Sequence, residues 1–257
     1  MKIGVCGGYK KAIIAKKLGF DYMEENLSRT AEYNEKEFAD CVASYERLAL
    51  PVYSFNGFFP GTLSLYGEDV SEIRQYTELA LSRAHVLGGK VCVIGSGKAR
   101  HIPNGMDDAF CRSRFTDVVA MCADIADRYG MRVVVEPLRR GETNFIHTAA
   151  EAAEIARDTR AKNAGGLVDF FHYVENDDAA ESLRAAKDRL WHAHLARPVD
   201  RAAPTEADIP QMEVWAALLK DVKYHGCISL ECRWGDPERF EAELAEAYRA
   251  TQAFRQL

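Results

Sequence analysis

Short apolar, β-branched runs alternate along the chain with longer stretches in which apolar residues recur at helical spacing. We count eight such rounds, a rhythm typical of parallel strands joined by helices. The predicted strands cover residues 2–6, 22–26, 51–56, 90–94, 132–137, 166–170, 190–195 and 227–231. Two clear helices are predicted over 69–87, before Gly88 and Gly89, and over 106–129, before Gly130.

Eight strand–helix units in 257 residues match the size of a (β/α)8 barrel. A doubly wound open sheet would need fewer strands and a glycine-rich nucleotide loop. Gly95-Ser96-Gly97, the one candidate for such a loop, lacks the third glycine of GxGxxG. We therefore predict a single TIM-barrel domain over residues 1–257.

The charge balance excludes several classes of protein. Lys and Arg number 33 against 39 Asp and Glu, so there is no basic excess to neutralise nucleic-acid phosphates. The longest uncharged stretch, 48–66, is broken by proline and glycine, and the apolar run at the N-terminus is too short for a signal peptide. We expect a soluble, cytoplasmic protein with reduced cysteines and with no nucleic-acid or membrane partner.

Polar residues stand at the carboxyl ends of four consecutive predicted strands, where barrel enzymes carry their chemistry. Glu136, Asp169, the pair His192 and His194, and Glu231 occupy these ends. Glu136 or Glu231, taken alone, is explained equally well by a strand-end ion pair. Three carboxylates converging with an imidazole would repel one another unless a cation lay among them, so the set predicts a divalent metal. Its oxygen-rich composition favours Mn²⁺, Mg²⁺ or Co²⁺ over a structural zinc site.

His192 and His194 point to the same side of their strand because strand side chains alternate with period two. His194 is nearer the carboxyl end of the strand, so we assign it to the metal. His192 is left as a core residue or as a partner of the ligands.

These residues resemble the xylose isomerase-like TIM-barrel superfamily, and within it the ketose 3-epimerase branch that includes the D-tagatose 3-epimerases. In that branch a glutamate, an aspartate, a histidine and a glutamate after strands five to eight bind one divalent metal, usually Mn²⁺. The matching residues here are Glu136, Asp169, His194 and Glu231. The resemblance therefore implies Mn²⁺, with Mg²⁺, Co²⁺ or Zn²⁺ as alternatives.

Two further spacings agree with the branch, and one departs from it. Glu142 lies six residues after Glu136, and His172 lies three residues after Asp169, where the branch has substrate-binding residues. The branch also has a substrate-binding arginine six residues after the histidine ligand. This chain has Asp200 there, flanked by Arg197 and Arg201, and we choose Arg201.

The resemblance implies a small-molecule sugar substrate and a metal-dependent epimerase that inverts a ketose carbon, C3, through a cis-enediolate. Glu136 and Glu231 would be the catalytic acid and base on its two faces, while Glu142, His172 and Arg201 would bind substrate. An aldose–ketose isomerase, a dehydratase or lyase acting on a sugar or inosose-like substrate, and a non-catalytic sugar-binding barrel are the alternatives. The branch also implies a homo-oligomer; the particular sugar and its phosphorylation stay open.

Two other groups of residues follow predicted strands. The loop Gly95-Ser96-Gly97-Lys98-Ala99-Arg100 would either hold a substrate phosphate or form a tight turn with solvated Lys98 and Arg100. The aromatic residues of the second group would either wall a sugar pocket or pack in the core. They are Phe55, Phe58, Phe59 and Trp234.

Overall fold

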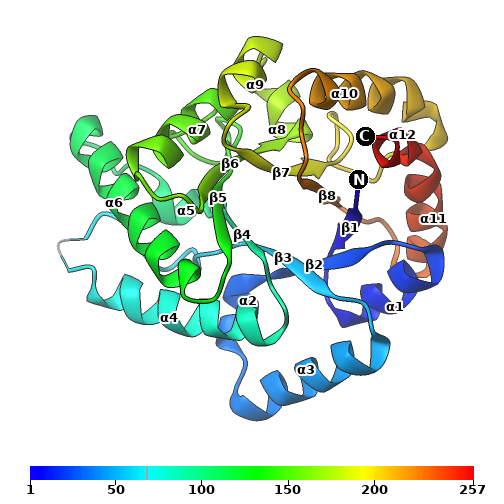
Figure 1. The fold of residues 1–257 in the computed structure, drawn as a ribbon, viewed down its shortest axis with the longest axis horizontal. Coiled ribbons are helices and arrows are strands. Elements are labelled where there is room, and N and C mark those ends of the chain that lie inside the picture. The colour runs from blue at the N-terminus through cyan, green and yellow to red at the C-terminus, as the bar shows by residue number, and fades with distance from the viewer. Residues whose placement is uncertain (68) are drawn as a thin grey trace.

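The computed structural model describes residues 1–67 and 69–257, which form a closed barrel of eight parallel strands inside a ring of helices (Figure 1). The strands follow one another around the barrel in chain order, and the last pairs with the first. The predicted TIM barrel is therefore confirmed. The two chain ends lie side by side, with the amino group of Met1 donating to the carbonyl oxygen of Arg255 at 3.2 Å.

The strands are β1 (Ile3–Cys6), β2 (Tyr22–Asn26), β3 (Val52–Asn56), β4 (Val91–Ile94), β5 (Arg132–Val135), β6 (Ala164–Asp169), β7 (Leu190–Leu195) and β8 (Cys227–Leu230). The α-helices are α1 (Tyr9–Leu18), α2 (Leu27–Glu32), α3 (Glu35–Leu48), α4 (Ser71–Val86), α5 (Gly97–Arg100), α6 (Asp108–Asp127), α7 (Ala149–Asp158), α8 (Phe170–Glu175), α9 (Ala180–Ala186), α10 (Ile209–Asp221), α11 (Phe240–Ala250) and α12 (Gln252–Arg255). Two short 3₁₀ turns, η1 (Glu206–Asp208) and η2 (Pro237–Arg239), precede α10 and α11.

Several predicted boundaries were wrong by one or two residues, most clearly at β6. Its predicted range, 166–170, begins two residues too late, because glycine usually indicates the end of a strand and the prediction therefore omits Gly165. In the structure Gly165 belongs to β6, and its lack of a side chain makes room for the ring of Trp191 on β7. A Cβ at Gly165 would lie 2.4 Å from Cε3 of the Trp191 ring. The range also ends too late, since Phe170 already belongs to α8. The Asp169 carboxylate caps that helix by accepting the Phe171 N–H at 2.8 Å.

The inside of the barrel changes from apolar to polar along its axis. Val91, Val93, Val134 and Leu167 form a separate apolar cluster. Two residues further along β5 and β6, on the same face of each strand, come Glu136 and Asp169. The larger apolar core lies outside this cluster and includes residues of the surrounding helices. The alternation of side chains thus places the carboxylates at one end of the barrel, next to this apolar cluster.

The described part of the chain contains no helix with both the length and the apolar character needed to cross a membrane. All seven cysteines are free thiols.

Candidate active site

Four of the predicted site residues meet at the carboxyl end of the barrel. Glu136 follows β5, Asp169 ends β6, His194 is near the end of β7, and Glu231 follows β8. One potential ligand atom from each lies within 4.8 Å of the other three. Glu136, Asp169 and His194 are buried, whereas the side chain of Glu231 is 23% exposed. We call this group the strand-end cluster.

His194 is central to the strand-end cluster. Its Nδ1 atom lies 3.2 Å from Oε1 of Glu136 and 3.1 Å from Oε2 of Glu231. A β-carbon at Gly95, directly after β4, would come 2.2 Å from Oε2 of Glu136, so a larger residue there would displace this carboxylate from its present position. The compact arrangement therefore depends on a glycine as well as on the four polar residues.

The electrostatics of the cluster indicate a shortage of positive charge. Burial, together with repulsion from Glu231, raises the pKa of Glu136, and burial raises the pKa of Asp169. Burial opposes ionisation of Glu231 as well, but His194 and Arg201 outweigh it and lower the pKa of Glu231 to about 2. Burial likewise opposes a charge on His194, yet Glu24 and Glu231 raise its pKa well above the ordinary value. His194 and Arg201 thus supply positive charge to Glu231, while the raised pKa values of Glu136 and Asp169 show that these two carboxylates are not fully compensated.

The strand-end cluster fits a divalent metal in both chemistry and spacing. Three carboxylates and one imidazole are ligands that Mn²⁺ and Mg²⁺ accept. An octahedral ion about 2.1 Å from its ligands holds neighbouring ligand atoms about 3 Å apart. The distances of 3.1 and 3.2 Å from His194 Nδ1 to the two glutamates agree with that separation.

Arg201 is the arginine that reaches the cluster. Its Nη2 atom donates to Oδ2 of Asp169 at 3.1 Å and to Oε2 of Glu231 at 2.5 Å. Arg201 has a positive φ of 56°, a left-handed conformation that is uncommon outside glycine. Arg197 instead pairs with Asp200 at the surface. Of the two sequence candidates, the structure brings Arg201 to the other site residues.

His172 lies beside Asp169 and is fully buried. Burial is the largest cause that lowers the pKa of His172, to about 4. Its Nδ1 atom accepts the backbone N–H of Arg139 at 3.2 Å, so the neutral ring carries its proton on Nε2. That atom lies 3.5 Å from Oδ2 of Asp169 and 3.3 Å from Nη1 of Arg201. The N–H of His172 is therefore held close to the strand-end cluster.

Glu142 lies farther out, on the loop after β5. Its Oε1 atom accepts a hydrogen bond from Nε of Arg139 at 2.9 Å and lies 3.6 Å from Nη1 of Arg201. The guanidinium groups of both arginines stack on the ring of Phe171, with their carbons 5.1 and 5.0 Å from its centroid. Arg201 thus connects Glu142 to the cluster, since it also contacts Asp169 and Glu231.

A cavity of about 540 Å³ opens above the strand-end cluster, within the size range of small-molecule sites. It is lined by Gly57, Ser96, Gly97, Glu136, Leu138, Arg139, Glu142, Arg201, Glu231, Cys232 and Arg233. Both glutamates of the cluster border it, while Asp169, His172 and His194 are buried and are not among its lining residues.

The two remaining sequence hypotheses are only partly met. Arg100 is fully buried and does not line the cavity, so the loop after β4 presents Ser96 and Gly97 to the mouth without that cation. Phe55, Phe58 and Phe59 are buried in the hydrophobic core, so they do not wall a sugar pocket. Trp234 lines a separate cavity of about 430 Å³ that shares Arg233 with the first.

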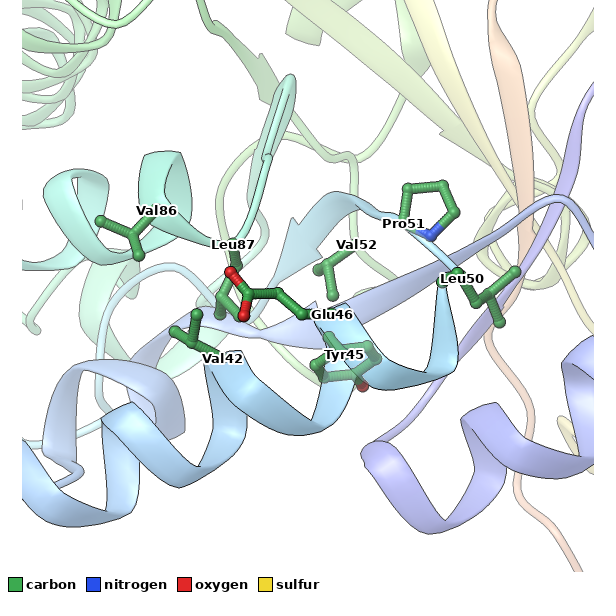
Figure 2. Close-up of a pocket in the computed structure, with 9 residues that line it drawn as sticks. Val42, Tyr45, Glu46, Leu50, Pro51, Val52, Val86 and Leu87 are labelled. Atoms are coloured by element: carbon green, nitrogen blue, oxygen red, sulfur yellow. The ribbon is translucent and has the colours of Figure 1, made fainter.

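Another cavity, of about 300 Å³, lies between α3 and α4 (Figure 2). Pro51 and Val52 at the start of β3 line it, so it belongs to the amino end of the barrel. It is lined mainly by aliphatic side chains such as Val42 and Leu87. Its position and its lining separate it from the strand-end cluster.

Sequence reasoning missed three residues that contact the cluster or its neighbour His172. Asn56, at the end of β3, donates from Nδ2 to Oε1 of Glu231 at 2.8 Å. Glu24, in β2, accepts from Nε2 of His194 at 2.8 Å. Arg139 donates its backbone N–H to His172. Asn56 ends β3, so the rule that found the other residues could have found it; Glu24 lies in the middle of β2, where that rule does not apply.

Comparisons with known proteins agree with this geometry. A D-psicose 3-epimerase from Agrobacterium fabrum is 27% identical over 223 residues, which are 84% of this chain and 75% of the relative. A 3-dehydro-D-guloside 4-epimerase from Escherichia coli is 26% identical over 192 residues, 70% of this chain and 71% of the relative. These relatives are carbohydrate epimerases, which supports an enzyme of the epimerase and isomerase kind.

The fold is shared with solved structures over its whole length. The structure of a D-psicose 3-epimerase with D-tagatose, from Clostridium cellulolyticum H10, superposes with a TM-score of 0.82 at 22% identity, covering 100% of this chain and 99% of that one. The family model for the xylose isomerase-like TIM barrel matches residues 13–255. The chain therefore belongs to the xylose isomerase-like TIM-barrel family.

Proposed function

We propose that the protein is a divalent-metal-dependent sugar epimerase that inverts C3 of a ketose. One observation carries the proposal: two glutamates from different strands, Glu136 and Glu231, border one cavity and flank one histidine nitrogen at 3.2 and 3.1 Å. Epimerisation at a carbon next to a carbonyl removes a proton from one face and returns one to the other, so it needs two acid–base groups. The epimerase relatives support the same class of reaction.

In this proposal the strand-end cluster, formed by Glu136, Asp169, His194 and Glu231, would hold the metal, with Mn²⁺ as the preferred ion. When bound, the ion supplies positive charge that acidifies the C–H beside the substrate's carbonyl and stabilises the enediolate.

The residues of this chain carry the proton transfers. One carboxylate, Glu136 or Glu231, removes the C3 proton, and the other, now acting as an acid, returns a proton to the opposite face. Asn56 and Arg201, which donate to the two oxygens of Glu231, orient that carboxylate. The guanidinium of Arg201, which lines the cavity, donates to substrate oxygens, and Glu142 binds hydroxyl groups farther from the reacting carbon. His172 is buried beside Arg201, so its Nε2–H would reach a substrate oxygen where the guanidinium shifts away from it.

The test is a panel of free and phosphorylated ketoses incubated with the Mn²⁺-loaded protein in D₂O and followed by NMR. We expect deuterium at C3, together with accumulation of the C3 epimer. Label only at C1 or C2 with an aldose as product would establish an isomerase. A product lighter by one water would establish a dehydratase, and label at C4 with inversion there would establish a 4-epimerase.

Two substitutions assign the proton transfers. Glu136→Gln and Glu231→Gln should each abolish net conversion, because each removes the group that serves one face. One of them should still exchange the C3 proton of a single epimer, since the remaining carboxylate serves the other face. Glu72→Gln, an exposed position on α4, is the matched control and should retain full turnover. Unchanged conversion by either cluster variant contradicts the proposal.

A further inference from the structure

A fully buried carboxylate, Glu24, lies inside the barrel beside the strand-end cluster. Its Oε1 atom accepts from Nε2 of His194 at 2.8 Å. Its Oε2 atom accepts from Nε2 of His192 at 2.7 Å, from Oγ of Ser54 at 2.6 Å and from Oγ of Ser229 at 2.5 Å. Four donors thus surround one carboxylate in a place that water does not reach.

The geometry decides where the two histidines carry protons. A carboxylate offers only acceptor atoms, so a ring nitrogen at 2.7 or 2.8 Å from it must be protonated. Nε2 of His194 therefore donates to Glu24. Nδ1 faces Glu136 and Glu231 at 3.2 and 3.1 Å, so the same rule places a proton there until an ion takes its place, and Nδ1 is the nitrogen that would bind the ion.

We propose that Glu24 is the positioning residue for His194: it fixes the ring's orientation and its Nε2–H tautomer, so that the Nδ1 lone pair points into the strand-end cluster. This inference rests on the metal site of the proposed function. Histidine ligands commonly donate their second N–H to a carboxylate, and loss of that partner typically costs roughly 10–100-fold in metal affinity or activity.

A competing interpretation is a second metal site, because Cys6, Glu24 and His194 also offer ligand atoms within 4.8 Å of one another. The hydrogen bonds argue against it. Nε2 of His194 carries a proton and donates it to Oε1 of Glu24, so this nitrogen has no lone pair to offer a second ion. Burial, and then repulsion from Glu24, raise the pKa of the Cys6 thiol well above its ordinary value, so it is a poor ligand.

The barrel backbone is adapted to this network. The pairing of β2 with β3 shifts by one residue between Met23 and Glu24, which brings Glu24 opposite Ser54. The pairing of β6 with β7 shifts in the same way, between Leu190 and His192. Such irregularities change the direction of the side chains that follow them. Here the residues that follow are Ser54 and His192, two of the four donors to Glu24.

Glu24→Gln is the sharpest test because it keeps the size of the side chain. An amide has one oxygen and one NH₂ group, and three donors face the position of Oε2. The amide oxygen is best placed there, which turns the NH₂ toward Nε2 of His194. Two N–H groups would then oppose each other unless the His194 proton moved to Nδ1, the atom that the metal needs.

The measurement is Mn²⁺ affinity, from the EPR signal of free Mn²⁺ during titration of the metal-free protein. We expect Glu24→Gln to bind about 10–100-fold more weakly than wild type. Ser54→Ala is the matched control, since it removes one donor from Oε2 and leaves the His194 contact intact; its affinity should stay within about threefold of wild type. A second readout is the ¹⁵N NMR spectrum of histidine in the Mg²⁺-loaded protein, where wild-type His194 should show its proton on Nε2.

The outcomes separate the two proposals. If wild-type protein fails to bind stoichiometric Mn²⁺, the metal site itself is wrong. If wild type binds and a folded Glu24→Gln variant binds equally well, with the His194 proton still on Nε2, the positioning role is overturned. Should the Gln variant fail to fold, Glu24→Asp retains the charge but withdraws the oxygens from His194. It should also bind Mn²⁺ more weakly than Ser54→Ala, and equal binding by these two variants would overturn the inference.

Discussion

Glu25, next to the positioning residue in β2, gives a quantitative test of the electrostatics at this end of the barrel. Its side chain is buried, with 6% of the residue exposed, and the hydroxyl of Tyr45 donates to its Oε1 atom. Burial is the largest effect on this carboxyl and raises its pKa from 4.5 to about 7. The Tyr45 hydroxyl, the backbone N–H of Asn26 and the charge of Arg29 offset only part of that shift.

The sign of the effect on stability follows from proton binding. Between pH 4.5 and about 7 the folded protein keeps a proton on Glu25 that the unfolded chain has released. Stability therefore falls as pH rises through this window, by up to about 1.4 kcal/mol per pH unit from this one group. The full cost, reached above pH 7, is about 3 kcal/mol.

Glu25→Gln removes the ionisation and keeps the shape, so it should remove this cost. We expect the variant to match wild type within about 1 kcal/mol at pH 4.5 and to exceed it by about 3 kcal/mol at pH 8. Equilibrium urea unfolding at both pH values measures the difference, since urea, being uncharged, does not screen the site. Glu46→Gln, an exposed position on α3, is the control and should change stability by less than about 0.5 kcal/mol at either pH. Parallel pH profiles for wild type and Glu25→Gln would refute the reasoning.

Four further substitutions test the site. Asp169→Asn should weaken Mn²⁺ binding by more than the roughly 10–100-fold expected for loss of an outer partner; unchanged affinity in a titration would remove Asp169 from the ligands. Arg201→Ala should leave Mn²⁺ affinity unchanged or tighter, because the guanidinium shares Asp169 and Glu231 with the ion, while KM for the ketose rises; weaker Mn²⁺ binding would contradict this. Glu142→Gln and His172→Gln should each lower kcat/KM and retain stoichiometric Mn²⁺ by metal analysis, and loss of metal from both folded variants would be inconsistent with their place outside the ligand set.

The sequence predicts the barrel and the strand-end cluster well because both depend on local rules. Short apolar runs separated by helical stretches specify most of the strands, with β2 the weakest case, and strand alternation specifies which side chains enter the barrel. Asp169 and Glu231 stand directly at or after strand ends. Since all eight strands are parallel, their carboxyl ends meet at one mouth whatever the details of the loops.

The role of Glu24 could not be predicted in this way. Two adjacent glutamates give β2 an acidic, solvent-exposed appearance, and a buried carboxylate is costly unless donors surround it. The donors come from Ser54, His192 and Ser229, which lie 30, 168 and 205 residues farther along the chain. Only the closed barrel brings these donors together, so no local sequence pattern predicts that Glu24 is buried among them.

Arg100 illustrates the same limit for a cation. Next to Lys98, in a loop that follows a strand, it looks like a surface charge, yet it is fully buried and Tyr66 donates to its backbone carbonyl oxygen at 2.5 Å. Two of its guanidinium nitrogens have no hydrogen-bond partner among the described residues. Burial, the largest effect, lowers the pKa of Arg100 to about 10. The direction of a long side chain depends on packing that the sequence does not display.

The contacts of Glu231 connect the Arg201 variant to the proposed chemistry. Asn56 donates to Oε1 of Glu231 and Arg201 donates to Oε2, so both carboxylate oxygens are engaged. In the proposed mechanism Glu231 takes a proton from carbon through an oxygen that faces that carbon, so we expect the contact that covers this oxygen to lengthen when substrate binds. Arg201 is the better candidate, because it borders the cavity from a strained backbone position and a substrate oxygen offers its guanidinium an alternative acceptor. In the proposed mechanism, substrate binding would thus free the base at the moment when it is needed.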